Sequence, residues 1–317
     1  MSIEPHDISA ADGTRLRLWE RSSPEPTHAV VFVHGATYAS RAIFAPDGAP
    51  TFSWLEAVAD AGGAGFGLDI RGYGDSERPA AMDGPPDAAD PPVRADVAAS
   101  DLRDAIETVR ERVDGDVHLV GTSWGTMIAG RMLAADDAPP VASATFHAPV
   151  YRPRAGLVEQ FAADDSIPAY RTVHRDEARS RWDDQIPTDD PATYRGGSEH
   201  DDPVFDAFWT ALVESGQRVD DASITAPNGT LLDLLDGASG KPVYDPSGID
   251  VPTLIIRGSL DPTSTRTDAI ELYDSLAVPA DERSYVEIAG GTHFIHLERR
   301  RHALYDAVRC FQRRYRR

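Results

Sequence analysis

The sequence predicts an α/β protein built on a mainly parallel, twisted β-sheet with helices on both faces. Apolar strand segments and amphipathic helical segments alternate along residues 29–146, and the alternation resumes after residue 250. The strand segments are apolar at consecutive positions, so both of their faces must be covered. This pattern favours a parallel sheet between two layers of helices.

The first predicted elements are a hairpin and a buried strand. Residues 6–20 have the alternating pattern of two paired strands, with the turn at residues 12–13. Residues 29–33 are all apolar and lead into the loop at 34–38. Glycine directly after a buried strand permits a sharp turn and leaves backbone N–H groups near the C-terminal edge of the sheet. We therefore expect an oxyanion donor in this loop.

A helix–strand–helix series follows. Residues 54–59 predict a short amphipathic helix, and the glycine-rich run 63–67 predicts a turn, because it precedes a strand and a phosphate loop would follow one. Residues 67–70 predict a third buried strand. The Pro-, Asp- and Ala-rich segment 79–92 predicts a surface loop, and the apolar stripe within 97–113 predicts a helix.

The stretch 117–133 is the part around which the rest of the sequence is organised. An apolar strand passes through Gly121, Ser123 and Gly125 into an apolar helix. A serine at the apex of such a turn has a strained backbone, and glycine two positions before and after it avoids obstruction by Cβ atoms. The hydroxyl then stands above the sheet edge, beside the positive N-terminus of the helix. A chance Gly-x-Ser-x-Gly in a loop is the alternative, and the flanking strand and helix favour a nucleophile.

Residues 150–247 interrupt the alternation because they contain no long apolar strand. Charged helical pieces at 175–182 and 205–213 are divided by prolines. A segment of this length inside an α/β pattern predicts an inserted helical cap and not a loop. The predicted core domain is therefore formed by residues 1–149 and 248–317.

Three polar residues follow predicted strands directly: Ser123, Asp261 and His293. In a parallel sheet, loops after strands share one edge, where ligands bind. A serine hydroxyl is a poor nucleophile until a base takes its proton; histidine suits this task, and a carboxylate fixes the tautomer of the histidine. The chain order Ser, Asp, His is typical of one α/β architecture. These residues are the predicted catalytic triad.

Other titratable residues are less well placed. His296 and His302 fall inside a helix, His147 is expected to be structural, and His34 is expected to hydrogen-bond the loop that it begins. Asp268 lies a helical turn or more beyond its strand and is expected to be solvated. No cluster of His, Cys and Asp has metal-ligand spacing, so neither a metal nor a cofactor is expected.

The sequence resembles the serine hydrolases of the α/β-hydrolase superfamily. The resemblance covers the whole chain and rests on segments 34–35, 69–76, 121–125, 258–261 and 291–294, which fall at the expected places. It implies an α/β-hydrolase fold in which the three triad residues serve, in chain order, as nucleophile, orienting carboxylate and base. It also implies an oxyanion hole made of the backbone N–H groups of Ala36 and Trp124, with Thr37 as the alternative to Ala36.

The residue at the apex of the strand–helix turn (the elbow), Ser123, limits the types of reaction that the protein could catalyse. Serine in place of aspartate argues against the haloalkane dehalogenase and epoxide hydrolase branches, which leaves acyl transfer to water. We favour a carboxylesterase that acts on small-molecule esters. An acyltransferase or a non-catalytic ligand receptor on the same fold remains an alternative.

A further alternative is a proline iminopeptidase. Those enzymes carry a similar Gly-x-Ser-Trp-Gly elbow, in which tryptophan follows the serine as Trp124 does here. The loop His34-Gly35-Ala36 differs, however, from the His-Gly-Gly-Pro-Gly usual in that family. Those enzymes bind an amino terminus with cap carboxylates. The acids of the predicted cap include Glu159, Glu177, Asp183, Asp184, Glu199 and Glu214.

The formal net charge of -21 argues against some classes of binding partner and predicts the salt concentration at which the protein works. Nucleic acids and anionic membranes require a basic footprint, so neither is an expected partner. Self-repulsion of this size is tolerated where salt screens it, since the Debye length is about 3 Å at 1 M. We predict a salt-rich cytoplasm, and therefore a melting temperature and an activity that rise between 0.1 M and 2 M KCl. A flat or falling response would contradict this prediction.

The remaining features concern the compartment. The single cysteine, Cys310, permits no intrachain disulfide and is expected to be a buried small side chain. The first residues have no signal-peptide pattern, and no stretch is long and apolar enough for a membrane span. A cytoplasmic protein with a small-molecule substrate is therefore expected, and the sequence says nothing of its oligomeric state.

Overall fold

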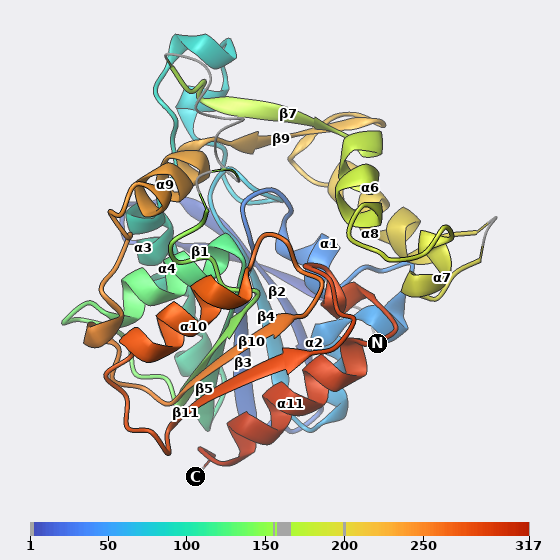
Figure 1. The fold of residues 1–317 in the computed structure, drawn as a ribbon. Coiled ribbons are helices and arrows are strands. Elements are labelled where there is room, and N and C mark those ends of the chain that lie inside the picture. The colour runs from blue at the N-terminus through green and yellow to red at the C-terminus, as the bar shows by residue number, and fades with distance from the viewer. Residues whose placement is uncertain (1–2, 155, 157–165, 199–200, 317) are drawn as a thin grey trace.

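The computed structural model describes residues 3–154, 156, 166–198 and 201–316. Its main feature is an eight-stranded sheet with the order β1-β2-β4-β3-β5-β6-β10-β11 (Figure 1). The pairs β1-β2 and β2-β4 are antiparallel and the other pairs are parallel, which confirms the predicted α/β class. The strands are β1 (Glu4–Ser9), β2 (Arg15–Ser22), β3 (His28–Val33), β4 (Ala64–Asp69), β5 (Asp116–Thr122), β6 (Ser143–His147), β10 (Thr253–Gly258) and β11 (Arg283–Ile288).

Helices cover both faces of this sheet and form two separate cores (Figure 1). Side chains of β3 alternate between the cores: Val31 belongs to the first, and Val30 and Phe32 belong to the second. The first core is completed by α3 (Ala95–Arg112), α4 (Trp124–Leu133) and α10 (Arg266–Ser275). The second is completed by α1 (Ser40–Phe44), α2 (Trp54–Asp60) and α11 (Arg301–Arg313). The strands β3, β4, β6 and β10 are buried at every position, as their continuous apolar runs predicted.

The segment 150–247 lies between β6 and β10 in the chain, and its described residues add no strand to the large sheet. Figure 1 shows its described elements above one edge of that sheet. The prediction of a purely helical cap is wrong, because the segment contains a three-stranded antiparallel sheet of order β7-β9-β8. Its elements are β7 (Tyr170–His174), α6 (Arg175–Asp183), α7 (Pro191–Arg195), α8 (Pro203–Val213), β8 (Arg218–Asp220), β9 (Ser223–Pro227) and α9 (Gly229–Ala238).

Local predictions fail where packing decides the outcome. The glycine run 63–67 lies mostly within β4, not in a turn. It contains glycine because a Cβ atom on Gly65 would lie 3.1 Å from the Cα atom of Leu55 in α2. The helix α1 was not predicted. Cys310 is exposed and not buried.

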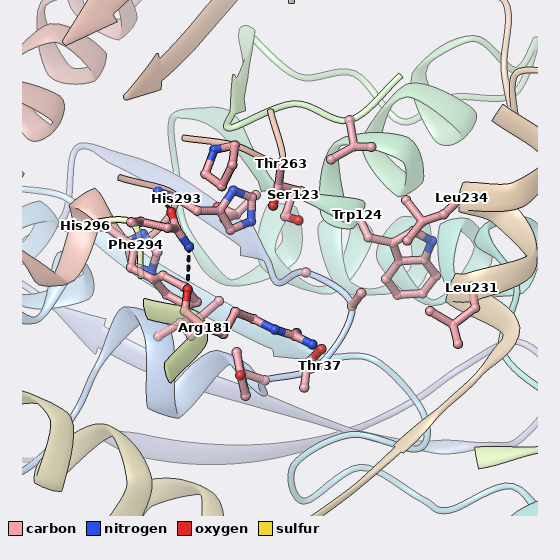
Figure 2. A pocket seen from close by; sticks show the side chains of 18 of the residues that line it. Thr37, Ser123, Trp124, Arg181, Leu231, Leu234, Thr263, His293, Phe294 and His296 are labelled. Carbon is pink, nitrogen blue, oxygen red and sulfur yellow. Dashed lines mark hydrogen bonds between the residues drawn. The ribbon is translucent and has the colours of Figure 1, made fainter. Parts of the chain in front are cut away.

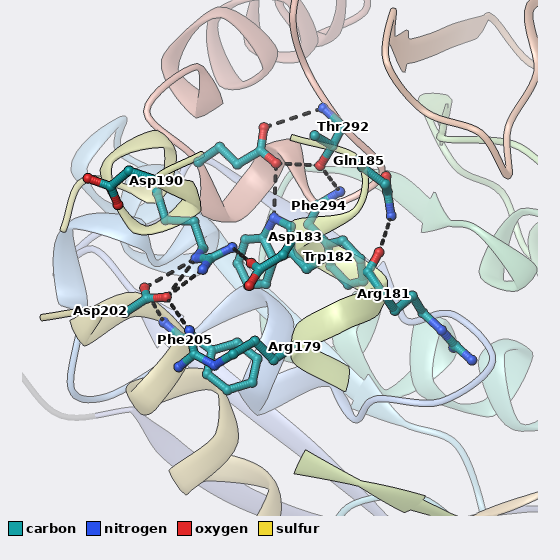
Figure 3. A network of polar contacts seen from close by, with 12 residues as sticks. Arg179, Arg181, Trp182, Asp183, Gln185, Asp190, Asp202, Phe205, Thr292 and Phe294 are labelled. Carbon is teal, nitrogen blue, oxygen red and sulfur yellow. Dashed lines mark hydrogen bonds and ion pairs between the residues drawn. The ribbon is translucent and has the colours of Figure 1, made fainter. Parts of the chain in front are cut away.

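A buried polar network joins the inserted segment to the loop after β11 (Figure 3). The fully buried Arg195 donates from Nη2 to Asp202 Oδ2 at 2.5 Å and from Nη1 to Asp183 Oδ1 at 2.6 Å. Its guanidinium lies 4.8 Å from the ring centroid of Trp182. The indole of Trp182 donates to Glu298 Oε1 at 3.0 Å, and the second carboxylate oxygen of Glu298 accepts from the backbone N–H of Thr292 at 3.3 Å. The network thus ends one residue before His293.

Buried histidines give the fold an acid limit. Burial lowers the pKa of His34 to about 4 and lowers the pKa of both His118 and His296 to about 3. These pKa values lie below about 6.5, the value of an unfolded histidine. Below pH 6.5 the unfolded chain therefore takes up protons that the folded chain does not, so the free energy of unfolding decreases as the pH is lowered. Each histidine contributes a slope of up to about 1.4 kcal/mol per pH unit until its folded pKa is reached.

The substitution His118→Asn tests this limit. We expect the free energy of unfolding, measured in urea at pH 7, 6 and 5, to fall less steeply in the variant, by about one proton or 1.4 kcal/mol per pH unit. The exposed His302→Asn is the control. Equal slopes in His118→Asn and the unmodified protein would contradict the assignment.

No helix in the described part of the chain is long and apolar enough to cross a bilayer.

Candidate active site

The chain makes a strained turn at Ser123, between β5 and α4. Ser123 has φ 56° and ψ -124°, a positive φ that non-glycine residues rarely adopt. Its neighbours permit the turn because they lack a Cβ atom. A Cβ on Gly121 would lie 2.6 Å from the carbonyl oxygen of Gly125, and a Cβ on Gly125 would lie 2.4 Å from that of Val33. The predicted strand–turn–helix geometry is thus present.

The loops after β10 and β11 bring Asp261 and His293 together. His293 Nδ1 lies 2.7 Å from Asp261 Oδ2. The other carboxylate oxygen of Asp261 accepts from the backbone N–H groups of Thr263 at 2.8 Å and Ser264 at 2.9 Å, which fixes the carboxylate plane. Asp261 is buried, whereas 14% of the His293 side chain is exposed. The Nε2 atom of the imidazole is therefore free of Asp261 and available to a second group.

The loop after β3 approaches the serine from the other side. A Cβ on Gly35 would lie 2.9 Å from Ser123 Cβ, so the peptide between Gly35 and Ala36 lies against the serine. His34 sets the direction of this peptide. Its Nε2 accepts from Ile70 N at 3.1 Å, which places the ring proton on Nδ1, 2.8 Å from the Gly35 carbonyl oxygen. Because a trans peptide is planar, holding that carbonyl fixes the opposite N–H, that of Ala36.

The inserted segment holds the next peptide of the same loop. The Ala36 carbonyl accepts from Tyr73 Oη at 3.0 Å and from Nη2 of Arg171, on β7, at 2.6 Å. The Thr37 carbonyl accepts from Nε2 of Gln217, which precedes β8, at 3.0 Å. The loop after β3 is therefore fixed from both the large sheet and the inserted segment.

These groups line a cavity of about 370 Å³ under the inserted segment (Figure 2). Figure 2 shows Ser123 and His293 directed into it. Its floor comes from the loops after β3, β5, β10 and β11, and its roof comes from the inserted segment. The residues that line it include Ala36, Thr37, Tyr38, Ser123, Trp124, Val150, Arg171, Arg181, Asp184, Gln185, Leu231, Leu234, His293, Phe294 and His296.

The other histidines and the other aspartate considered for the triad have different hydrogen-bond partners or lie elsewhere in the fold. His147 is fully buried behind the pocket, where its Nδ1 lies 3.3 Å from Thr122 Oγ1. His296 lines the pocket but does not follow a strand directly, and His302 lies exposed on α11. The expectation that Asp268 is solvated is wrong. Asp268 is buried because its carboxylate accepts from the backbone N–H groups of residues 151 and 152, at 2.9 and 2.6 Å.

Residues of the inserted segment also contact the candidate site, although no sequence pattern predicts them. Gln185 Oε1 accepts from the backbone N–H of His293 at 2.9 Å. Asp233 Oδ2, on α9, accepts from the Trp124 indole at 2.9 Å, and burial raises the pKa of this carboxyl. Their spacing from the triad along the chain is irregular, so only the fold shows that they meet it.

Within the described residues, no group of three or more His, Cys, Asp and Glu side chains is arranged to hold a metal ion.

Comparisons with known proteins agree with this fold. A crystal structure of E-2-(acetamidomethylene)succinate hydrolase superposes with a TM-score of 0.66 at 17% identity, over 98% of this chain and 99% of that one. An esterase from Exiguobacterium antarcticum gives 0.62 at 19% identity, over 97% and 99%. A thermophilic esterase from Thermogutta terrifontis, with malate bound, gives 0.64 at 16% identity, over 99% and 100%. At these identities the likeness establishes the fold alone.

The sequence itself carries the family assignment. No curated protein matches the chain in sequence. Residues 30–307 match the profile described as "Alpha/beta hydrolase family", which is most of the chain. The chain therefore belongs to the alpha/beta hydrolase family.

Proposed function

We propose that the protein is a serine carboxylesterase that hydrolyses small-molecule esters through an acyl-serine intermediate. One observation carries the proposal. A serine with a strained backbone and a histidine held 2.7 Å from a buried carboxylate are directed into one cavity. Strain of this kind costs about 1–3 kcal/mol and is concentrated at functional sites.

In the proposed reaction Ser123 Oγ attacks the ester carbonyl carbon, and His293 Nε2 takes the proton of the Ser123 hydroxyl at the same time. Asp261 accepts from Nδ1 and stabilises the imidazolium. Collapse of the tetrahedral intermediate breaks the ester bond, and the imidazolium returns its proton to the leaving alcohol. Water then attacks the acyl-serine with the same base, which releases the carboxylic acid and restores the serine.

We assign the oxyanion hole to the backbone N–H groups of Trp124 and Ala36. Trp124 is the first residue of α4, where an N–H has no partner within the helix. The peptide of Ala36 lies against the serine and its direction is set by His34, so we prefer Ala36 to Thr37. Donors fixed before the reaction stabilise the charge that develops on the carbonyl oxygen.

We also propose that residues 150–247 act as a cap domain over a core of residues 1–149 and 248–317. The cap sheet and α9 contribute Arg171, Leu231 and Leu234 to the cavity wall. These side chains would shape the space available to the substrate.

A proline iminopeptidase is less well supported. Such an enzyme needs carboxylates that face the free amino group of its substrate. Of the six cap acids named in the sequence analysis, Asp183 pairs with Arg195, Glu214 with Arg41 and Glu177 with Arg181. Glu159 and Glu199 lie outside the described residues. Among the described residues that line the cavity, Asp184 is the only acid, and two arginines accompany it.

A substrate panel tests the reaction class. We expect turnover of p-nitrophenyl esters and none of aminoacyl p-nitroanilides, at both low and high salt. Turnover confined to the prolyl anilide would favour the peptidase. Ester cleavage only with an alcohol or thiol acceptor would favour an acyltransferase, and tight binding without turnover would favour a receptor.

A further inference from the structure

Positive charge is concentrated in the wall of the cavity, although the chain as a whole carries a formal charge of -21. Arg171 on β7 and Arg181 on α6 both line the cavity. Burial lowers the pKa of Arg171, and the positive charge of Arg181 contributes to this lowering. Asp184 is the only acid among the described residues that line the cavity, so the two arginines leave an excess of positive charge there.

The described contacts of Arg171 do not supply that group. Its Nη1 donates to the carbonyl of Pro227 at 3.1 Å and to Asn228 Oδ1 at 2.8 Å. Its Nη2 donates to the carbonyl of Ala36 at 2.6 Å and to Thr37 Oγ1 at 2.9 Å. All of these acceptors are neutral. The guanidinium is therefore held rigidly while its charge remains available to the cavity.

Arg181 is the freer of the two cations. Figure 2 shows its side chain extended along the cavity wall toward Thr37. Its ion-pair partner in the described structure, the exposed Glu177 one helical turn earlier, lies 3.7 Å away, beyond hydrogen-bond distance. A loose surface pair of this kind is readily exchanged for a better acceptor.

A buried hydroxyl lies in the same wall. Tyr38 lines the cavity and is 7% exposed, and its Oη has no hydrogen-bond partner among the described residues. Arg181 lines the same cavity as Tyr38. Burial raises the pKa of Tyr38, and the positive charge of Arg181 acts in the opposite direction. Buried hydroxyl groups are normally paired, so an unpaired one in a cavity wall indicates a missing acceptor.

We propose that Arg181 and Tyr38, supported by the fixed charge of Arg171, form a subsite for a carboxylate of the substrate. This inference rests on the proposed function and narrows it: the substrates are anionic esters, such as half-esters of dicarboxylic acids. The free carboxylate accepts from the Arg181 guanidinium and from the Tyr38 hydroxyl while the ester group lies at Ser123. A guanidinium fork matches the two oxygens of a carboxylate. One free guanidinium fits a single negative charge better than a phosphate dianion.

The ratio of two substrates tests the subsite. Mono-p-nitrophenyl glutarate and p-nitrophenyl valerate have acyl chains of equal length and differ in the terminal charge. We expect kcat/KM to favour the glutarate ester, and Arg181→Gln to lower this ratio by about tenfold or more, mainly through KM. Tyr38→Phe should lower it by less.

The matched control is Arg218→Gln. Arg218 belongs to the same segment and pairs with Asp221 on the surface, so its substitution changes the net charge equally without touching the cavity. The ratio should stay as in the unmodified protein. An equal ratio in Arg181→Gln and Arg218→Gln overturns the subsite while leaving the esterase in place.

Binding separates the two proposals. Glutarate should bind the Ser123→Ala variant, measured by calorimetry, and the further change Arg181→Gln should weaken this binding about tenfold. If neither ester is hydrolysed but glutarate binds in this way, the esterase is wrong and the subsite stands. Failure of glutarate to bind overturns the subsite, as does equal or tighter binding of inorganic phosphate.

Discussion

Replacement of Ser123 by alanine is expected to lower kcat/KM for ester hydrolysis by at least about 10⁴-fold, because in the proposed mechanism the Ser123 oxygen forms the acyl intermediate. His293→Gln should cost about as much, since nucleophile and base act as a unit. Asp261→Asn should cost about 10³- to 10⁴-fold, because the amide no longer holds the productive tautomer. Initial rates with p-nitrophenyl esters measure all three, and each variant should retain the melting temperature of a folded protein.

The rival carboxylate gives the matched control. Asp268→Asn removes a buried carboxylate that accepts from the backbone N–H groups of residues 151 and 152. We expect lower stability and a kcat/KM within about tenfold of the unmodified protein, because Asp268 has no contact with His293 in the described structure. A loss in Asp268→Asn equal to that in Asp261→Asn, or full activity in Ser123→Ala, would contradict the triad.

Loss of the Arg195 charge is expected to be the most destabilising single change in the cap. Arg195→Met leaves the buried Asp202 with Arg179, 2.9 Å away, and takes from Asp183 an ion-pair partner at 2.6 Å. Breaking a buried ion pair from one side costs about 3–5 kcal/mol. Because Arg179 still compensates part of the Asp202 charge, we expect a loss near the lower end of this range. Urea unfolding at neutral pH measures the difference.

Two further variants give this prediction its controls. Arg175→Met breaks a pair with the exposed Asp206, which lies 2.6 Å away on the surface, and should cost less than about 1 kcal/mol. Arg195→Met combined with Asp202→Leu removes both buried charges and should recover part of the lost stability. Equal costs for Arg195→Met and Arg175→Met would show that burial of the pair has no consequence.

The same variant should also affect catalysis. Arg195 packs on Trp182, which reaches the residue before His293 through Glu298. A looser network therefore lowers kcat without changing the chemistry of the triad.

The core could be predicted from the sequence because its signals are local. Continuous apolar runs mark the parallel strands, and the elbow around Ser123 marks the position where the chain reverses. The residues of the proposed triad follow strands, and the topology then brings Asp261 and His293 to one edge.

The inserted segment could not be predicted in the same way. In β7, only Val173 is buried, and β8 is exposed throughout, so neither has the alternation of a half-buried strand. Asp268 shows the same limit, because an acidic residue on a helix is buried here by backbone N–H groups more than a hundred positions away in the chain. Contacts of this kind leave no periodic trace in the sequence.

The double attachment of the loop after β3 limits how this enzyme can be re-engineered. Arg171 and Gln217 hold the Ala36 and Thr37 carbonyls, and Gln185 holds the backbone of His293. A chimaera in which residues 150–247 are replaced by the corresponding segment of another protein would lose these hydrogen bonds together with the original selectivity. Exchanged segments that retain Arg171, Gln185 and Gln217 should keep turnover while the substrate range changes. These three residues are therefore the ones that any replacement segment must preserve.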